Sequence, residues 1–115
     1  MAIIIKTKNP DQLLQSLNDA IENREILTWM VDDDGDYTIT RDQWQYHAWM
    51  KPYPHHEEGI LFFGIVQSRR YNMTKELYGI YHGRFVATLL SHFDTLMDDI
   101  QVSPLLLKDI DIVEE

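Results

Sequence analysis

Apolar residues recur at helical spacing through one long stretch, residues 72–100. At about 100° per residue, one stripe of large side chains runs along this stretch, comprising Leu77, Tyr81, Phe85, Leu89, Phe93 and Met97. A second line widens the apolar face and runs through Tyr78, Val86 and Leu90. The pattern predicts a long helix that lies with this face on a sheet.

A third line on the same predicted helix carries almost no side-chain bulk: Gly79, Gly83 and Ala87. Each glycine within a helix costs roughly 0.5–1 kcal/mol relative to alanine, so two of them indicate an offsetting gain. The simplest gain is the close approach of another backbone. We therefore expect a close-packing line here, and expect Gly83→Leu to destabilise the fold or break a dimer.

The first half of the chain predicts strands and one further helix. β-Branched residues 3–5 are typical of a short strand, and an amphipathic helix is expected to begin at Pro10, after a cap at Asn9 or Asp11. Strand formers at residues 25–32 and 37–40 flank Asp34-Gly35, which predicts a hairpin with a type I′ turn.

The middle of the chain alternates and then becomes continuously apolar. Residues 44–51 alternate as a strand would, with Trp44 and Tyr46 facing the core and His47 and Trp49 on the outer face. Residues 52–59 are expected to form a loop. Residues 60–66 are apolar at odd and even positions alike, which is typical of a strand covered on both faces. Two helices can cover only one face, so either the segment from residue 102 onwards or a second copy must cover the other.

These elements predict an α+β fold in two layers. We expect a mainly antiparallel sheet of four or five strands with two helices on one face, in the order β-α-β-β-β-β-α. Residues 1–101 are predicted to form a single domain. Residues 102–115 are an acidic and apolar C-terminal segment that is either docked or disordered.

Charge and composition limit the function classes. The net charge is −9, and residues 25–58 alone contain eight acidic and two basic residues, giving −6. A chain this acidic is a poor candidate for binding along a nucleic-acid groove. It has no cysteine, and its first residues resemble neither a signal peptide nor a membrane span, so we expect a soluble cytoplasmic protein without membrane contact.

Neither of two suggestive clusters predicts a metal site. Alternating carboxylates at residues 32–36 resemble the start of a calcium loop, but Tyr37 and Gln43 stand where that loop requires glycine and glutamate. Residues 55–58, His-His-Glu-Glu, are expected to lie in a solvated loop without fixed geometry. No catalytic motif is present, so we expect no metal or cofactor, and no enzymatic activity is assigned.

Five residues are candidates for ligand or partner contacts: His47, Trp49, Tyr78, His82 and Arg84. The leading hypothesis is a small acidic protein that acts through protein–protein contacts as a homodimer, because tryptophan is enriched in interfaces and the glycine line needs a neighbour. One alternative is a small-molecule-binding protein or enzyme that uses the Tyr, His and Arg side chains. A further alternative is an acidic nucleic-acid mimic that uses residues 25–58.

Overall fold

The computed structural model describes residues 2–40, 42–104 and 106–113. Along the chain the elements are β1 (Ile3–Lys6), α1 (Pro10–Glu22), β2 (Trp29–Val31), β3 (Tyr37–Ile39), β4 (Ala48–Glu57), β5 (Ile60–Gln67), α2 (Lys75–Phe93), the short 3-10 helix η1 (Asp94–Leu96) and β6 (Asp99–Val102). In the described part of the chain, no helix has the length and apolar character needed to span a membrane.

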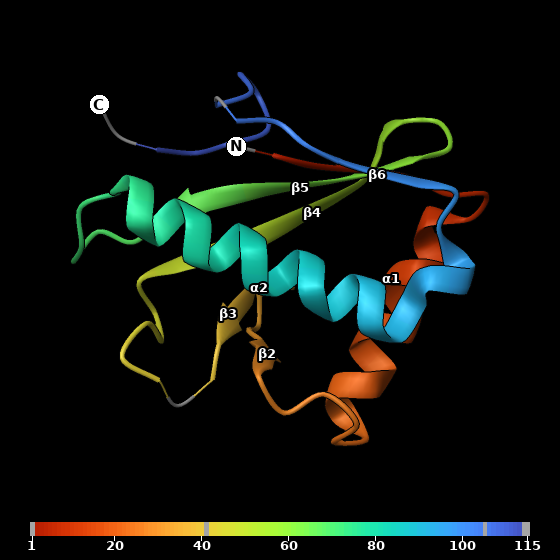
Figure 1. Ribbon diagram of the computed structural model, residues 1–115, viewed down its shortest axis with the longest axis horizontal. Helices are drawn as coiled ribbons and strands as arrows, with labels where there is room; N and C mark the ends of the chain where they lie inside the picture. The colour runs from red at the N-terminus through yellow and green to blue at the C-terminus, as the bar shows by residue number, and fades with distance from the viewer. Residues whose placement is uncertain (1, 41, 105, 114–115) are drawn as a thin grey trace.

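The six strands of the described residues belong to one sheet, in the order β2-β3-β4-β5-β1-β6, and neighbouring strands pair antiparallel. Both helices pack on the same face (Figure 1). This arrangement confirms the predicted α+β class. The sheet has one strand more than expected, because β6 follows α2 and pairs with β1 at the sheet edge.

Large aromatic side chains fill the space between the helices and the sheet. Phe85 of α2 is fully buried, and its ring centroid lies 4.8 Å from that of Trp29 and 4.7 Å from that of Phe63. Both pairs meet edge to face, the arrangement that the charge distribution of the rings favours. Five residues of the predicted stripe are buried here: Leu77, Tyr81, Phe85, Leu89 and Phe93.

Both helices begin at side-chain caps. The Asn9 side chain accepts a hydrogen bond from the Gln12 N–H at 3.0 Å, and Pro10 occupies the first turn, where its missing N–H costs nothing. The Thr74 hydroxyl accepts a hydrogen bond from the Leu77 N–H at 3.1 Å and so starts α2.

The C-terminal end of α2 differs from the prediction of a helix over residues 72–100. The helix stops at Phe93, η1 follows, and Met97 has extended dihedrals (φ −123°, ψ 138°). The acidic side chain of Asp98 is unfavourable at the negative end of a helix. Ile100 and its neighbours instead pair with β1, an outcome that helical periodicity does not reveal.

β4 continues through much of the region that was predicted to be a loop. Pro52 pairs with Phe63, and the pairing resumes at Glu57 after an irregularity. The prolines are tolerated because β3 meets β4 only at Tyr37 and Met50, so the far half of β4 has a free side where no N–H donor is needed. The predicted loop is thus wrong except at its end, where Gly59 turns with φ +73°.

The predicted hairpin at Asp34-Gly35 joins β2 to β3. Only Gly35 of the two central residues has a positive φ (+84°), so the turn is not of type I′, which requires a positive φ at both. Instead the Asp32 carboxylate accepts a hydrogen bond from the Asp34 N–H at 2.9 Å and stabilises a longer loop.

The first part of the C-terminal segment, residues 106–110, lies on the face of β5 opposite α2 (Figure 1), and Ile112 then forms a parallel bridge with Val66 at the edge of β5. Ile110 is buried there against Phe62. A Cβ atom added to Gly64 would lie 1.9 Å from the Ile110 carbonyl oxygen, so only glycine lets the two backbones cross. Over this part of β5, the outer face is therefore covered by the chain itself.

Backbone and carboxylate hydrogen bonds hold the C-terminal segment in place. The Asp111 carboxylate accepts one from the Ile65 N–H and one from the Leu107 N–H, both at 2.8 Å. Ile112 donates its N–H to the Ile65 carbonyl and accepts from the Gln67 N–H, also at 2.8 Å. One carboxylate thus ties a turn of the segment to the strand beneath it.

Candidate functional site

The five predicted contact residues fall into separate groups. Tyr78 and His82 are neighbours on α2. Arg84 lies on another flank of the same helix and lines a different hollow. His47 and Trp49 lie at the start of β4, where each stacks on another aromatic ring. The structure therefore brings Tyr78 and His82 together but distributes the complete set over several surfaces.

Tyr78 and His82 form a stacked pair with ring centroids 5.4 Å apart. His82 is buried, and its Nδ1 atom lies 2.8 Å from the Tyr78 carbonyl oxygen. The Tyr78 hydroxyl is buried and has no hydrogen-bond partner among the described residues. Burial, with a smaller contribution from the charge of Asp111, raises the pKa of Tyr78 to about 12. The hydroxyl is therefore neutral at physiological pH.

Arg84 lies 3.2 Å from the carboxylate of Asp42. The pair lines an open cleft of about 540 Å³ above Trp29 and Ile39. The pKa of Asp42 lies below its usual value, chiefly because the Trp44 N–H donates a hydrogen bond to the carboxylate and also because Arg84 is close. Both side chains are well exposed, so this ion pair adds little stability.

An aromatic cleft of about 490 Å³ lies at the start of α2. Its lining comprises Trp44, His47, Tyr71, Asn72, Thr74, Glu76 and Leu77. The rings of His47 and Tyr71 stack with centroids 3.6 Å apart, and Trp44 meets His47 at an interplanar angle of 69°. The three rings therefore form two nearly perpendicular walls, with the carboxyl-bearing Glu76 in the same lining.

The chain beside the aromatic cleft adopts a costly conformation. Tyr46 has φ +62°, a left-handed backbone that costs a tyrosine roughly 1–3 kcal/mol. Its N–H donates to the Thr38 hydroxyl at 3.1 Å, which holds the turn. Tyr46 was predicted to face the core with Trp44, but 48% of it is exposed and its ring stacks on Trp49. The turn thus displays aromatic side chains that regular alternation would bury.

A third hollow, the edge groove, lies between α2 and β6. It has a volume of about 310 Å³ and is lined by Gly79, His82, Gly83, Val86 and Val102. A Cβ atom added to either glycine would meet no atom within 4 Å, so the chain's own packing does not require these glycines. The two glycines of the predicted close-packing line therefore border open space within the described protomer, whereas Ala87 lines the cleft beside Arg84.

The apolar surface beside the edge groove is partly exposed. Val102 is 42% exposed, and Leu90, one turn beyond Val86 on α2, is 48% exposed. Val102 shares a sheet face with Ile3, its partner on β1, and Ile3 is fully buried beneath the helices. The helix-covered core thus continues to the sheet edge and ends there at the surface.

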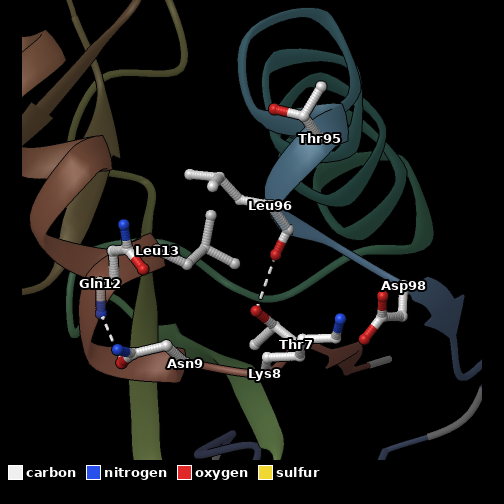
Figure 2. A pocket seen from close by; sticks show the side chains of 8 residues that line it. All are labelled: Thr7, Lys8, Asn9, Gln12, Leu13, Thr95, Leu96 and Asp98. Atoms are coloured by element: carbon white, nitrogen blue, oxygen red, sulfur yellow. Dashed lines mark hydrogen bonds between the residues drawn. The ribbon is translucent and has the colours of Figure 1, made fainter.

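A fourth hollow, of about 200 Å³, lies where β1 passes into α1, and Figure 2 shows its lining side chains. The Thr7 hydroxyl donates to the Leu96 carbonyl at 2.7 Å, and the Asn9 side chain caps α1 (Figure 2). These contacts join the first strand to the segment after α2. We therefore assign this hollow a structural role.

The acidic region does not form a single row. Asp32, Asp34 and Asp36 lie in the β2–β3 turn, whereas Glu57 and Glu58 lie at the far end of β4. Burial is the main cause that raises the pKa of Asp36, and Lys51 opposes it. Within residues 2–40, 42–104 and 106–113, no three His, Asp or Glu side chains come together as a metal site would require.

Sequence reasoning missed two features of these surfaces. Tyr71 completes the aromatic cleft, yet it is 24 positions from His47 and follows two arginines in an irregular segment. Val102 completes the edge groove but stood in the predicted C-terminal segment. The only available signal for β6 was the short alternation of Ile100 and Val102.

Comparison with known protein families, with curated proteins and with solved structures gives no significant match.

Proposed function

We propose that the protein acts through protein–protein contacts as a homodimer, in which two copies pair along β6 with their edge grooves facing each other. The observation that supports this is the apolar flank formed by Gly79, Gly83, Val86 and Val102, which continues the core to the sheet edge. Two helix glycines beside open space lower helix stability, and a close neighbour would account for them.

The edge of β6 offers backbone groups for such a contact. The Ser103 N–H donates to the Ala2 carbonyl at 2.8 Å. Because hydrogen bonding alternates along an antiparallel pair, Gln101 also faces β1, whereas Ile100 and Val102 direct their N–H and C=O groups to the open edge. A strand edge of this kind readily pairs with another strand.

β6 is complementary to itself in one register. A two-fold axis through Gln101 places Ile100 opposite Val102 of the second copy, with hydrogen bonds in both directions. The two side chains then extend the apolar helix-covered face across the interface. In this register Asp99 faces Ser103 of the second copy, so no carboxylates stand directly opposite each other despite the charge of −9 on each chain.

Sedimentation velocity at micromolar concentration tests the dimer. We expect the wild type to sediment as a dimer and Val102→Lys to sediment as a monomer, because a lysine at the strand edge opposes pairing. Leu27→Lys is the matched control, since Leu27 is 68% exposed and lies outside the groove. A monomeric wild type, or equal loss of the dimer in both variants, would contradict the proposal.

Gly83→Leu gives a second, independent reading. The added leucine side chain enters open space in the single chain. The melting temperature of the monomer should therefore fall by no more than is usual when an apolar side chain is added at the surface. It would, however, occupy the space proposed for the second copy, and we expect a monomer. A dimer of unchanged strength would show that the groove is not the interface.

We further propose that the dimer functions in the cytoplasm. The chain has no cysteine, so its fold needs no disulfide and is suited to a reducing compartment. Cell fractionation with an antibody against the chain tests this location.

A further inference from the structure

The geometry of the aromatic cleft points to a binding site for a guanidinium group, most simply the side chain of an arginine in a partner protein. This inference goes beyond self-association and does not depend on it. The cleft lies at the start of α2, and none of its lining residues lines the edge groove. If the protein is a monomer that binds a guanidinium group in this cleft, the inference stands and only the proposed dimer is overturned.

The walls of the cleft suit a flat cation. A guanidinium stacks on aromatic faces, and cation–π attraction strengthens when the cation leaves bulk water. Trp44 stands at 69° to His47, and His47 is stacked with Tyr71. A planar group can therefore lie along one wall while its edge meets the other.

Glu76 supplies the charge that a guanidinium needs. Its carboxylate is the acidic group in the lining, and it can accept two parallel hydrogen bonds from one guanidinium. The N-terminus of α2 carries about half a positive charge and Lys75 is the sequence neighbour of Glu76, so this carboxylate acts on a ligand through direct contact in the cleft. Asn72 and Thr74 add neutral polar groups that can bind the rest of a ligand.

The size of the cleft and the charge of the protein favour an arginine within a polypeptide. At about 490 Å³, the cleft falls within the usual range of ligand sites and leaves room beyond one side chain for flanking peptide. The net charge of −9 attracts basic partners over long distances. Tyr71 in the lining and Tyr46 beside the cleft are both exposed and of a type enriched among interface hot spots.

NMR titration of the full chain tests this site. The probe is N-acetyl-arginine methylamide, and N-acetyl-citrulline methylamide is its neutral isostere. We expect saturable shifts of the Trp44 indole N–H and the Glu76 backbone N–H, with binding at least tenfold tighter for arginine than for citrulline. Equal binding of the two would overturn the inference, as would the absence of shifts at Trp44.

Matched variants separate the cleft from general attraction. Glu76→Gln should weaken arginine binding at least tenfold, whereas Glu58→Gln removes the same charge from an exposed position at the β4–β5 turn and should change it less than twofold. Tyr71→Ala should weaken binding, and Tyr71→Phe should preserve it. Equal losses in Glu76→Gln and Glu58→Gln would show long-range attraction alone and overturn the site.

Two further probes identify whether the ligand is a peptide or a small molecule and whether its charge is positive or negative. Tighter binding of Gly-Gly-Arg-Gly-Gly than of free arginine supports a protein partner, and the reverse order supports the guanidinium chemistry but assigns it to a free small molecule. Inorganic phosphate is the opposite case. If phosphate shifts Trp44 and Glu76 while the arginine probes do not, the cleft is an anion site and the inference is wrong.

Discussion

The two faces of the sheet are closed in different ways. On the helix face, α1 and α2 cover the strands with interlocking large side chains, and Phe85 touches rings from β2 and β5. On the outer face, a short segment packs Ile110 against Phe62, and the segment is held beside β5 by the parallel pairing of Ile112 with Val66 and by the Asp111 carboxylate. The first face depends on side-chain volume, whereas the second depends on the absence of a side chain at Gly64.

This difference decides how each face responds to substitution. Removing volume from the helix face leaves a cavity that the surrounding rings cannot fill. Adding volume to the outer face instead separates two backbones that now touch. The same contrast separates Gly64, where an added Cβ atom would lie 1.9 Å from a backbone oxygen, from Gly79 and Gly83, where it would enter open space.

Phe85→Ala should have the largest effect. Its ring lies among Trp29, Tyr37 and Phe63, so truncation should lower the free energy of unfolding by about 3–5 kcal/mol. Urea unfolding followed by tryptophan fluorescence measures the loss. Leu90→Ala is the control on the same helix, because Leu90 is 48% exposed and its truncation should cost far less. Similar losses in both variants would contradict the assigned core.

Gly64→Ala should destabilise by about 1–3 kcal/mol, the usual cost of overpacking. The new methyl group would overlap the Ile110 carbonyl, so we expect the C-terminal segment to move away from β5. Hydrogen exchange should accelerate at Ile112 and Gln67, whose N–H groups hydrogen-bond between the segment and the strand. Unchanged protection at both positions would show that the segment is not seated as described.

The helix face was predictable because its pattern is long and regular. The stripe from Leu77 to Phe93 is buried throughout. Residues 60–66 are apolar at odd and even positions alike, and this pattern correctly predicted a strand that is covered on both faces. Gly64 also gave a usable signal, since a glycine inside a strand often marks a close backbone approach. The identity of the approaching segment had no local signature.

Features set by distant contacts were not predictable. Pro52 belongs to a strand only because β3 leaves one side of β4 free, which no local pattern shows. The aromatic cleft brings together His47, which precedes β4, and Tyr71, which follows β5, so its parts are separate in sequence. By contrast, Tyr78 and His82 are four positions apart on one helix, and their proximity follows from helical geometry alone.

Gly79→Ala should stabilise the single chain by about 0.5–1 kcal/mol, the difference in helix propensity between these residues. The added methyl group meets no atom within 4 Å, unlike the one at Gly64. Thermal unfolding at a concentration where the protein is monomeric measures this gain. Gly35→Ala is the opposing control, because φ +84° makes alanine costly there. A loss at Gly79 would mean that the helix flank is more crowded than the structure shows.

Tyr78→Phe should change stability least at neutral pH, by at most about 1 kcal/mol, and in the stabilising direction. The substitution removes a buried hydroxyl that has no hydrogen-bond partner among the described residues. Tyr81→Phe is the matched control on the same helix, since the Tyr81 hydroxyl donates to the Trp44 carbonyl and its loss should destabilise. Chemical denaturation of both variants compares them directly.

Alkaline pH tests Tyr78 in a second way. Its pKa is raised from 10.0 to about 12 by burial, so between these values the unfolded chain has lost the proton that the folded chain keeps. The free energy of unfolding must therefore fall as pH rises through this window. Tyr78→Phe should flatten part of that fall, while Tyr37 and Tyr81, whose pKa values burial also raises, maintain the rest. An identical alkaline slope in the variant would show that the Tyr78 hydroxyl reaches water.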